Sequence, residues 1–144
     1  MRTESALHSV SVTGVVIRAD GRVLMTQRAD DGRWVPPGGI LELHETPQQG
    51  VVREVREETG IDIRPEQLTG VYKNMLLGVV SLAFRCTPLT DHPHTSTEVQ
   101  AVAWLTTQEA IAAAPQARAI RIRDALRPDG PFVRAHDGTS LLPA

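Results

Sequence analysis

Short runs of β-branched and aliphatic residues, separated by turn residues, recur along most of the chain and predict strands. In residues 22–28 the run has the two-residue alternation of a strand, with Val23 and Met25 on one side. Asp20-Gly21 comes just before it and predicts a hairpin, because Gly21 can adopt the positive φ that a type I′ turn needs. The expected strands are residues 8–18, 22–28, 68–76, 79–86 and 98–105.

The clearest helix of the sequence covers about residues 47–59, where both ends carry their own signals. Thr46 is the expected N-cap, Pro47 suits the first helical position, and Gln49 completes a capping box. Gly60 follows the last turn and is a favourable C′ residue, because it can adopt the left-handed conformation at no steric cost. The residues at the start and at the end of this segment therefore both support a single helix.

The remaining segments predict a mixture of loops and helices. Residues 34–39, with two prolines followed by two glycines, exclude a regular helix and a central strand. Residues 87–97 have the composition of a mobile loop. Two further helices are expected at about residues 106–114 and 115–126.

Length and composition predict one globular domain. The chain has 144 residues, of which 41% are hydrophobic and 22% charged, and these values exclude wholesale disorder. We expect a single domain over residues 1–144, with an ordered core at about residues 8–127 and a loose tail at residues 128–144. Strands and helices alternate irregularly, which predicts a mixed α/β arrangement rather than regular βαβ units.

Charge and cysteine content narrow the function and the location. The formal net charge of -2 disfavours a nucleic-acid polymer as partner, since such binding usually needs a basic excess. Cys86 is the single cysteine and cannot form an internal disulfide, which favours a reducing cytoplasm. Residues 1–7 lack the apolar core of a signal peptide, and the longest apolar stretch, residues 76–84, is far shorter than the ~20 residues that span a bilayer. We therefore expect a cytoplasmic protein outside the membrane.

Acidic residues on the predicted helix carry the strongest chemical signal. At about 100° per residue, Glu54, Glu57 and Glu58 share one side of the helix. The opposite side would pack on a sheet through Val52, Val55 and Thr59. Carboxylates at these spacings repel one another by roughly a few tenths of a kcal/mol per pair, and Glu45 adds another charge one turn before the helix. A hard cation such as Mg²⁺ would compensate this charge, since it prefers carboxylate, water and phosphate oxygens.

An acidic stripe alone is usually a solvated face, so its neighbours decide between that interpretation and a metal site. Arg53 is spaced to pair with Glu57 at i, i+4 and so to orient a ligand from behind. The Pro37-Gly38-Gly39 turn can bring bare backbone close to a metal or a phosphate, since neither glycine has a side chain. Together with the helix cap, these features favour the metal site.

A stretch of 23 residues resembles the signature of the Nudix hydrolases. Gly39, five residues, Glu45, seven residues and then Arg-Glu-Val-Arg-Glu-Glu-Thr-Gly-Ile at residues 53–61 match that signature without a gap. Seven fixed letters and two aliphatic positions agree, and chance agreement somewhere in the chain is on the order of one in a million. Outside the signature, the resemblance spans roughly residues 10–126 as a pattern of strands and helices.

The resemblance implies an α/β/α sandwich with a mixed central sheet, in which the signature forms a loop-helix-loop. It also implies hydrolysis of a nucleoside diphosphate linked to another moiety, with Mg²⁺ or Mn²⁺ as cofactor. By position in the signature, Glu45 would contact metal-bound water and Arg53 would hold the glutamates in place. The metal ligands would be Gly38, through its carbonyl, with Glu54, Glu57 and Glu58.

The mechanism implied by the resemblance follows from charge. Metal ions bridge the substrate diphosphate and the carboxylates, and they position a water for in-line displacement. A carboxylate takes the proton of that water, and the candidates are Glu54, inside the signature, and Glu98, which follows the long loop. His44 and Gly50 depart from the residues common in the family, at variable positions, and Gly50 should cost up to ~1 kcal/mol of helix stability.

Candidate substrate contacts are few, since aromatic residues make up only 3% of the chain. Trp34 and Tyr72 are the expected substrate contacts that would stack on a nucleobase, with core packing as the alternative for Trp34. Phe84 is a third stacking candidate, for which core packing is favoured. Gly39 and Arg28 complete the expected substrate contacts.

Other conspicuous side chains have plainer expectations. Phe84 and Trp104 should pack in the core, and Cys86 should be a small apolar filler. His92 and His94 should be exposed on their loop. Four arginines are expected to form a solvated helix face, with a phosphate contact or a dimer salt bridge as alternatives: Arg118, Arg121, Arg123 and Arg127.

The leading hypothesis is a metal-dependent pyrophosphohydrolase acting on a small nucleotide derivative. The substrate stays open among ADP-ribose-like sugars, (deoxy)nucleoside triphosphates including oxidised ones, and dinucleoside polyphosphates. A second hypothesis is a module that senses a nucleotide sugar without turnover, which the three intact glutamates disfavour. A third is an isomerase of isoprenoid diphosphates, which would need a cysteine and further acid–base residues in the pocket. Cys86 alone gives thin support, and its burial in the core, away from the predicted helix, would exclude this hypothesis. A homodimer is expected by analogy alone.

Overall fold

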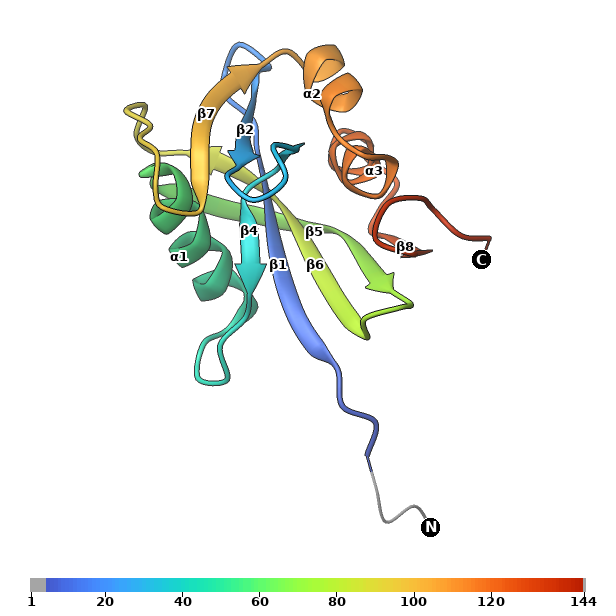
Figure 1. Cartoon of the computed structure of the whole chain (residues 1–144). Helices are drawn as coiled ribbons and strands as arrows, with labels where there is room; N and C mark the ends of the chain where they lie inside the picture. Colours follow the sequence, from blue (N-terminus) through green and yellow to red (C-terminus); the bar gives the residue numbers. More distant parts are fainter. Residues whose placement is uncertain (1–4, 144) are drawn as a thin grey trace.

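Two β-sheets and three helices make up the computed structural model over residues 5–143, the part of the chain that the structure describes (Figure 1). The larger sheet has the strand order β4-β1-β6-β5-β8, and the smaller has the order β3-β2-β7. The elements are β1 (Ser9–Val16), β2 (Val23–Arg28), β3 (Trp34–Val35), β4 (Gly38–Ile40), α1 (Pro47–Thr59), β5 (Ile63–Asn74), β6 (Val79–Pro88), β7 (Val99–Leu105), α2 (Thr107–Ala113), α3 (Gln116–Ala125) and β8 (Phe132–His136).

The larger sheet is mixed and lies between helices. β1 and β6 run parallel, as do β5 and β8, whereas β4 lies antiparallel to β1 and β5 antiparallel to β6. Side chains of β1 alternate between two cores. Val12 packs in the core that includes Val51 and Val55 of α1. Val15 packs in the core that includes Ile122 of α3. The predicted α/β/α sandwich with a mixed central sheet is confirmed.

The hairpin predicted around Asp20-Gly21 is wrong. β1 and β2 meet through an isolated bridge between Ile17 and Val23 and then enter different sheets. Gly21 has a φ of 87°, but Asp20 does not have a positive φ, so the turn is not type I′. Both strands carry runs of consecutive buried residues, because each lies inside a layered core instead of forming a two-stranded ribbon.

Helix α1 begins and ends as predicted. The Thr46 hydroxyl accepts a hydrogen bond from the Gln49 N–H at 3.2 Å, and the Gln49 side chain accepts one from the Thr46 N–H at 2.9 Å. Gly60 has a φ of 75° and donates its N–H to the Arg56 carbonyl. Both caps come from residues adjacent to the helix, so its bounds can be predicted from the local sequence alone.

The strands after α1 are longer than predicted: β5 begins at Ile63 instead of residue 68, although it ends at Asn74 instead of residue 76, and β6 continues to Pro88 instead of ending at residue 86. β5 accommodates Pro65 through register shifts along its pairing with β6. The connection that follows β6 lacks regular structure, but its backbone is anchored, because the His94 N–H donates to the Thr59 carbonyl at 2.8 Å. This connection leads to Glu98, directly before β7.

The tail at residues 128–144, predicted to be loose, instead contains β8, at the edge of the larger sheet. β8 runs parallel to β5 and ends with His136 opposite Asn74. The following residues return to α3, where the Ala117 N–H donates to the Thr139 carbonyl at 2.9 Å. A five-residue strand has too few positions for a periodic signal, and its partner is far away in the sequence.

Among residues 5–143, none of the helices has the length and apolar character needed to cross a membrane. The prediction about a signal peptide concerns residues 1–7, of which residues 1–4 lie outside the described part of the chain.

Candidate active site

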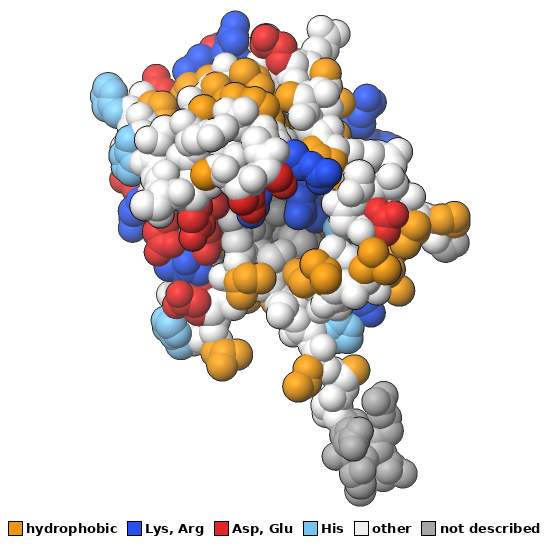
Figure 2. Space-filling view, in the orientation of Figure 1, with side chains coloured by type: hydrophobic (Ala, Val, Ile, Leu, Met, Phe, Trp, Pro, Cys, Tyr) orange, Lys and Arg blue, Asp and Glu red, His pale blue; other side chains and the backbone are white. Residues whose placement is uncertain are grey.

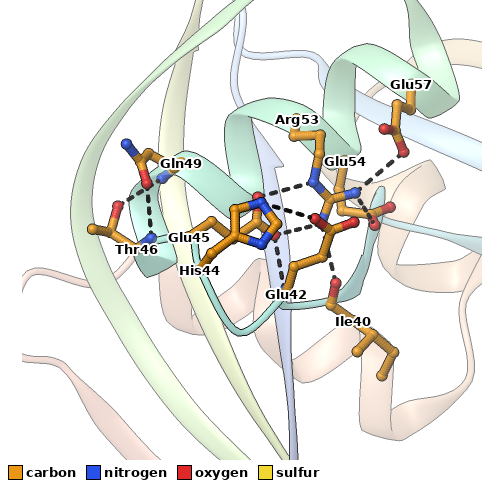
Figure 3. Close-up of polar contacts among 9 residues, drawn as sticks. All are labelled: Ile40, Glu42, His44, Glu45, Thr46, Gln49, Arg53, Glu54 and Glu57. Carbon is orange, nitrogen blue, oxygen red and sulfur yellow. Dashed lines mark hydrogen bonds and ion pairs between the residues drawn. The ribbon is translucent and has the colours of Figure 1, made fainter.

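Arg53 ties three carboxylates of the signature together (Figure 3). Its Nε atom donates to Glu45 at 2.9 Å, and its Nη1 atom donates to Glu54 at 2.8 Å and to Glu57 at 3.2 Å. Its Nη2 atom donates to Glu45 and, at 3.1 Å, to the Ile40 carbonyl. The predicted Arg53–Glu57 pair is therefore present, within a wider network that also holds the loop before α1. Such a guanidinium fork fixes carboxylate positions in a way that a lysine cannot.

Glu45 is the carboxylate that this network controls most tightly. Its side chain is 8% exposed. The Arg53 hydrogen bonds, and then the Glu42 N–H at 3.0 Å, lower the pKa of Glu45 to about 2. Glu45 therefore stays ionised and directed at Arg53 throughout the physiological pH range.

Two other glutamates of α1 approach the backbone of β4. The Gly38 N–H donates to the Glu58 carboxylate at 2.9 Å. A Cβ atom at Gly39 would lie 2.5 Å from the Glu54 carboxylate, so only glycine allows this approach. Burial, followed by the nearby charges of Glu54 and Glu98, raises the pKa of Glu58 to about 7. Burial is also the main cause of the raised pKa of Glu54.

These features fit a divalent cation in chemical terms. Buried carboxylates that repel one another are stabilised by a positive charge, and hard cations prefer such oxygens. The predicted ligands do not all converge, since the Glu57 side chain is 60% exposed and directed at Arg53. Within residues 5–143, no three acidic, histidine or cysteine side chains lie close enough together to hold a metal ion. The ligand set Gly38, Glu54, Glu57, Glu58 and Glu45 stays a prediction.

A cavity of about 770 Å³ opens beside Glu58, between the larger sheet and the smaller one. Figure 2 looks toward a hollow that is edged by acidic side chains and, next to them, by basic ones. Glu58 and Glu98 line the cavity on the acidic side, and Arg118 and Arg121 of α3 supply basic groups. The volume is in the range of small-molecule sites.

Four of the predicted site residues outside α1 line this cavity: Arg28, Gly38, Gly39 and Glu98. Arg28 is bound to Asp30, with Nε and Nη2 donating to the two carboxylate oxygens at 3.0 and 2.8 Å. The carbonyl of Glu98 accepts the Ala29 N–H at 3.0 Å, which fixes its backbone, while its side chain stays exposed. Their predicted roles stay predictions.

The two predicted stacking residues are not among the residues that line the cavity. Tyr72 is fully buried, and its hydroxyl donates to Asp124 at 2.7 Å. It cannot stack on a nucleobase because the Arg121 guanidinium covers its ring, at 4.9 Å from the centroid. Trp34 lies in the short strand β3 and packs, partly buried, against the core that includes Val15. The prediction for Tyr72 is therefore corrected to a structural role, whereas that for Trp34 stays a prediction.

The solvated arginine face predicted on α3 is wrong for two of its four members. Arg121 is 2% exposed and Arg118 is partly buried, and both line the cavity. A signal was available, because Ala117 and Ala125 lie one turn before and after Arg121 and mark that face as buried. Three further residues of the cavity could not be predicted, since long-range pairing brings them there: Thr13, Ser81 and His136.

Cys86 is 1% exposed and packs with Val51, Val55 and Phe84 in the core under α1. Burial raises the pKa of its thiol to about 12, so it stays protonated, and it is not among the residues that line the cavity. The isomerase hypothesis thereby loses its cysteine. Phe84 and Trp104 pack against the same core, and His92 and His94 are exposed, all as predicted.

The fold and site together define a class: an α/β/α sandwich whose capped, glutamate-rich helix faces a glycine strand at the rim of a cavity. Comparison with known proteins identifies the family to which this class corresponds. The model of the NUDIX domain matches residues 7–126. The chain is 55% identical over 142 residues to a MutT-like protein of Streptomyces ambofaciens, covering 99% of this chain and 92% of the relative. The chain therefore belongs to the NUDIX domain family, and its enzyme class is that of the Nudix pyrophosphohydrolases.

Two more distant proteins are also similar. The CTP pyrophosphohydrolase of Escherichia coli K12 is 29% identical over 107 residues, which cover 71% of this chain and 79% of that enzyme. The crystal structure of a NUDIX hydrolase from Nitrosomonas europaea superposes with a TM-score of 0.77 at 22% identity, over 92% of this chain and 82% of that one. The second similarity supports the fold alone.

Proposed function

We propose that this chain hydrolyses the diphosphate linkage of a nucleoside diphosphate joined to another moiety, with Mg²⁺ or Mn²⁺ as cofactor. The observation that supports this most directly is the approach of α1 to the glycine strand, with Glu58 on the Gly38 N–H and Glu54 against Gly39. Glu58 and Gly39 line a nucleotide-sized cavity, and the Glu54 carboxylate lies against Gly39. An anionic diphosphate can approach these carboxylates only if a cation lies between, since like charges would otherwise repel.

The cation would be held by Glu54, Glu57, Glu58 and the Gly38 carbonyl, with Glu45 beside them. When bound, it neutralises diphosphate charge and acts as a Lewis acid at phosphorus. Arg53 keeps Glu45 and Glu54 in position before the cation arrives. Glu57 is the most exposed of the set, so packing does not hold it beside Arg53.

A carboxylate must accept the proton of the attacking water. Glu98 lines the cavity with an exposed side chain on a fixed backbone. Glu54 is the alternative, and burial raises its pKa toward the range of a useful base, although Arg53 binds one of its oxygens. Both carboxylates remain candidates for this role.

The test is the release of phosphate or nucleoside monophosphate from a panel of nucleoside-diphosphate derivatives, with Mg²⁺, with Mn²⁺ and with EDTA. We expect metal-dependent hydrolysis of at least one compound. Glu57→Gln and Glu58→Gln should lower turnover by orders of magnitude with the fold intact, whereas Glu66→Gln, on the exposed side of β5, should not. Wild-type rates in both signature variants would contradict the proposal.

The second candidate, a module that senses a nucleotide sugar without turnover, predicts a different result in the same panel. Tight binding of one compound without release of product in any metal would favour it. The same panel also distinguishes ADP-ribose-like sugars from (deoxy)nucleoside triphosphates as the substrate, by which compound is hydrolysed fastest. A similar enzyme, the CTP pyrophosphohydrolase, supports the second class. The free thiol of Cys86 supports the proposed cytoplasmic location, and the homodimer stays a prediction.

A further inference from the structure

Arg121 lines the cavity, and no carboxylate among residues 5–143 forms a salt bridge with it. Its Nη1 atom donates to the Thr13 hydroxyl at 2.8 Å and to the Ser81 hydroxyl at 3.0 Å. Its Nε atom has no hydrogen-bond partner among the residues that the structure describes, although the residue is only 2% exposed. Hydroxyl groups satisfy donors but do not neutralise charge, so a positive charge is buried here at a high cost in free energy.

Arg118, one turn earlier on α3, brings a second positive charge to the same cavity. It is partly buried and forms no salt bridge within residues 5–143. Burial lowers the pKa of both arginines, that of Arg121 to about 9, with Arg118 contributing through its charge. Both therefore remain charged at neutral pH. Asp31, which also lines the cavity, raises the pKa of Arg118 through its charge, but it forms no salt bridge with either arginine. Asp30 is bound to Arg28.

His136 of β8 faces the Arg121 guanidinium as another donor. The Gly138 N–H donates to the His136 Nδ1 atom at 2.9 Å, so Nδ1 acts as an acceptor and carries no proton. Burial, followed by the charge of Arg121, lowers the pKa of His136 to about 4 and keeps the ring neutral, with its proton on Nε2. This Nε2–H lies 3.4 Å from the Arg121 Nη2 atom. Because the Arg121 Nη2 atom and the His136 Nε2 atom both carry protons, neither can accept a hydrogen bond from the other. Both could instead donate to one acceptor atom of a bound ligand.

We propose that Arg118, Arg121 and His136 form a subsite for a phosphate group of the substrate other than the two phosphates of the scissile linkage. The role of this subsite in the reaction depends on the proposed function, because the phosphate belongs to the substrate of that hydrolysis. A phosphate group offers only acceptors and carries more than one negative charge near neutral pH, so it satisfies the donors and the charge together. A nucleobase offers acceptors without the charge and leaves the arginines uncompensated.

Three strands of the larger sheet connect this subsite to Glu58, which lines the same cavity. Gly38 of β4 binds Glu58 and is the pairing partner of Thr13 on β1. Thr13 and Ser81, on the next strand β6, hold Arg121. Neighbouring strands lie about 4.8 Å apart, so the backbone of Gly38, which binds Glu58, lies one to two strand spacings, about 5–10 Å, from the strands of Thr13 and Ser81, which hold Arg121. One nucleotide can span that distance. The cation at α1 would then bind oxygens of the scissile linkage, and the subsite would bind oxygens of the additional phosphate.

Two kinds of substrate present such a phosphate. One is a nucleoside triphosphate, whose chain extends beyond the scissile linkage. The other is a nucleotide sugar that carries a phosphate monoester on its sugar or ribose. A nucleotide sugar without an additional phosphate leaves the subsite empty.

Direct binding is measured with inorganic tripolyphosphate, titrated calorimetrically in EDTA, where no cation attracts it to the carboxylates. We expect the wild-type protein to bind it, and Arg118→Gln and Arg121→Gln to weaken binding at least tenfold. Arg123→Gln, exposed on the same helix, is the matched control and should bind like wild type. Thermal melts report folding, and Arg118, being only partly buried, supplies the test if Arg121→Gln does not fold. Equal binding by the folded variants, or none by wild type, would overturn the subsite.

Substrate choice is measured with Mg²⁺ as kcat/KM for a nucleoside triphosphate, a neutral nucleotide sugar and the same sugar with a phosphate monoester. Arg118→Gln should lower kcat/KM at least tenfold for the compound with the additional phosphate, and which compound responds identifies the source. The neutral nucleotide sugar should be unaffected. Losses of equal size on all three would overturn the subsite and leave the proposed function standing. Tripolyphosphate binding without hydrolysis of any compound would overturn the proposed function instead.

Discussion

The contact between Gly39 and Glu54 allows a quantitative prediction for Gly39→Ala. The new Cβ atom would lie 2.5 Å from a Glu54 carboxylate oxygen, where ordinary contact begins near 3.4 Å. The carboxylate must therefore retreat by about 0.9 Å, the difference between these two distances. It is the end of a flexible side chain, so the fold can absorb the change, but its 2.8 Å bond to Arg53 cannot persist unchanged.

A displacement of about 1 Å at a catalytic group costs on the order of 100-fold in rate, and we expect this loss in kcat/KM for Gly39→Ala. The assay is metal-dependent hydrolysis of the best compound of the panel, with thermal melting to show that stability is retained. Leu43→Ala is the control, because this side chain is fully exposed in the loop between β4 and α1.

The double variant tests whether Glu54 transmits the effect. If Gly39→Ala acts by displacing this carboxylate, adding it to Glu54→Gln should cost little more than Glu54→Gln alone. Losses that multiply, or a wild-type rate in Gly39→Ala, would refute the steric argument.

Four other perturbations follow from the site. Arg53→Lys should lower kcat/KM by roughly 100-fold at a similar melting temperature, because an ammonium cannot hold three carboxylates in the same geometry. Glu98→Gln should lower kcat by about 10²–10⁴-fold with unchanged Mg²⁺ affinity if Glu98 accepts the proton; weaker Mg²⁺ binding would make it a ligand. Mg²⁺ should raise the wild-type melting temperature, reversibly with EDTA, and raise it less in Glu58→Gln. Gly50→Ala should fall short of the ~1 kcal/mol that a helix gains from alanine, as urea melts will show, because its Cβ would lie 2.5 Å from the Leu41 side chain.

The sequence predictions that the structure confirms are those that depend on residues close together in the sequence. The ends of α1 follow from Thr46, Gln49 and Gly60, all adjacent to the helix. The failures concern partners that are distant in the sequence. Asp20-Gly21 allows a turn but does not decide that β1 and β2 join different sheets. β8 exists because β5 offers it an edge, which no pattern within residues 128–144 reveals.

In the candidate site, too, the contacts between residues close in the sequence could be predicted, and those between distant segments could not. The network around Arg53 is contained within one loop and one helix, and spacing alone predicted its pair with Glu57. The cavity is assembled from both sheets and α3, so its contents depend on tertiary packing. Composition singled out Tyr72 as an aromatic and therefore a stacking candidate, but the burial of its ring under Arg121 is decided by α3.

The parallel pairing of β8 with β5 has a consequence for how this enzyme can diversify. The carboxylates of α1 are encoded in one continuous stretch, whereas His136 and the loop that orients it come from the last strand, at the edge of the sheet. An edge strand contacts one neighbour, so its residues can change with less disturbance to the core than those of a central strand. Substitutions in β8 would therefore alter recognition at the proposed subsite without changing any residue of α1.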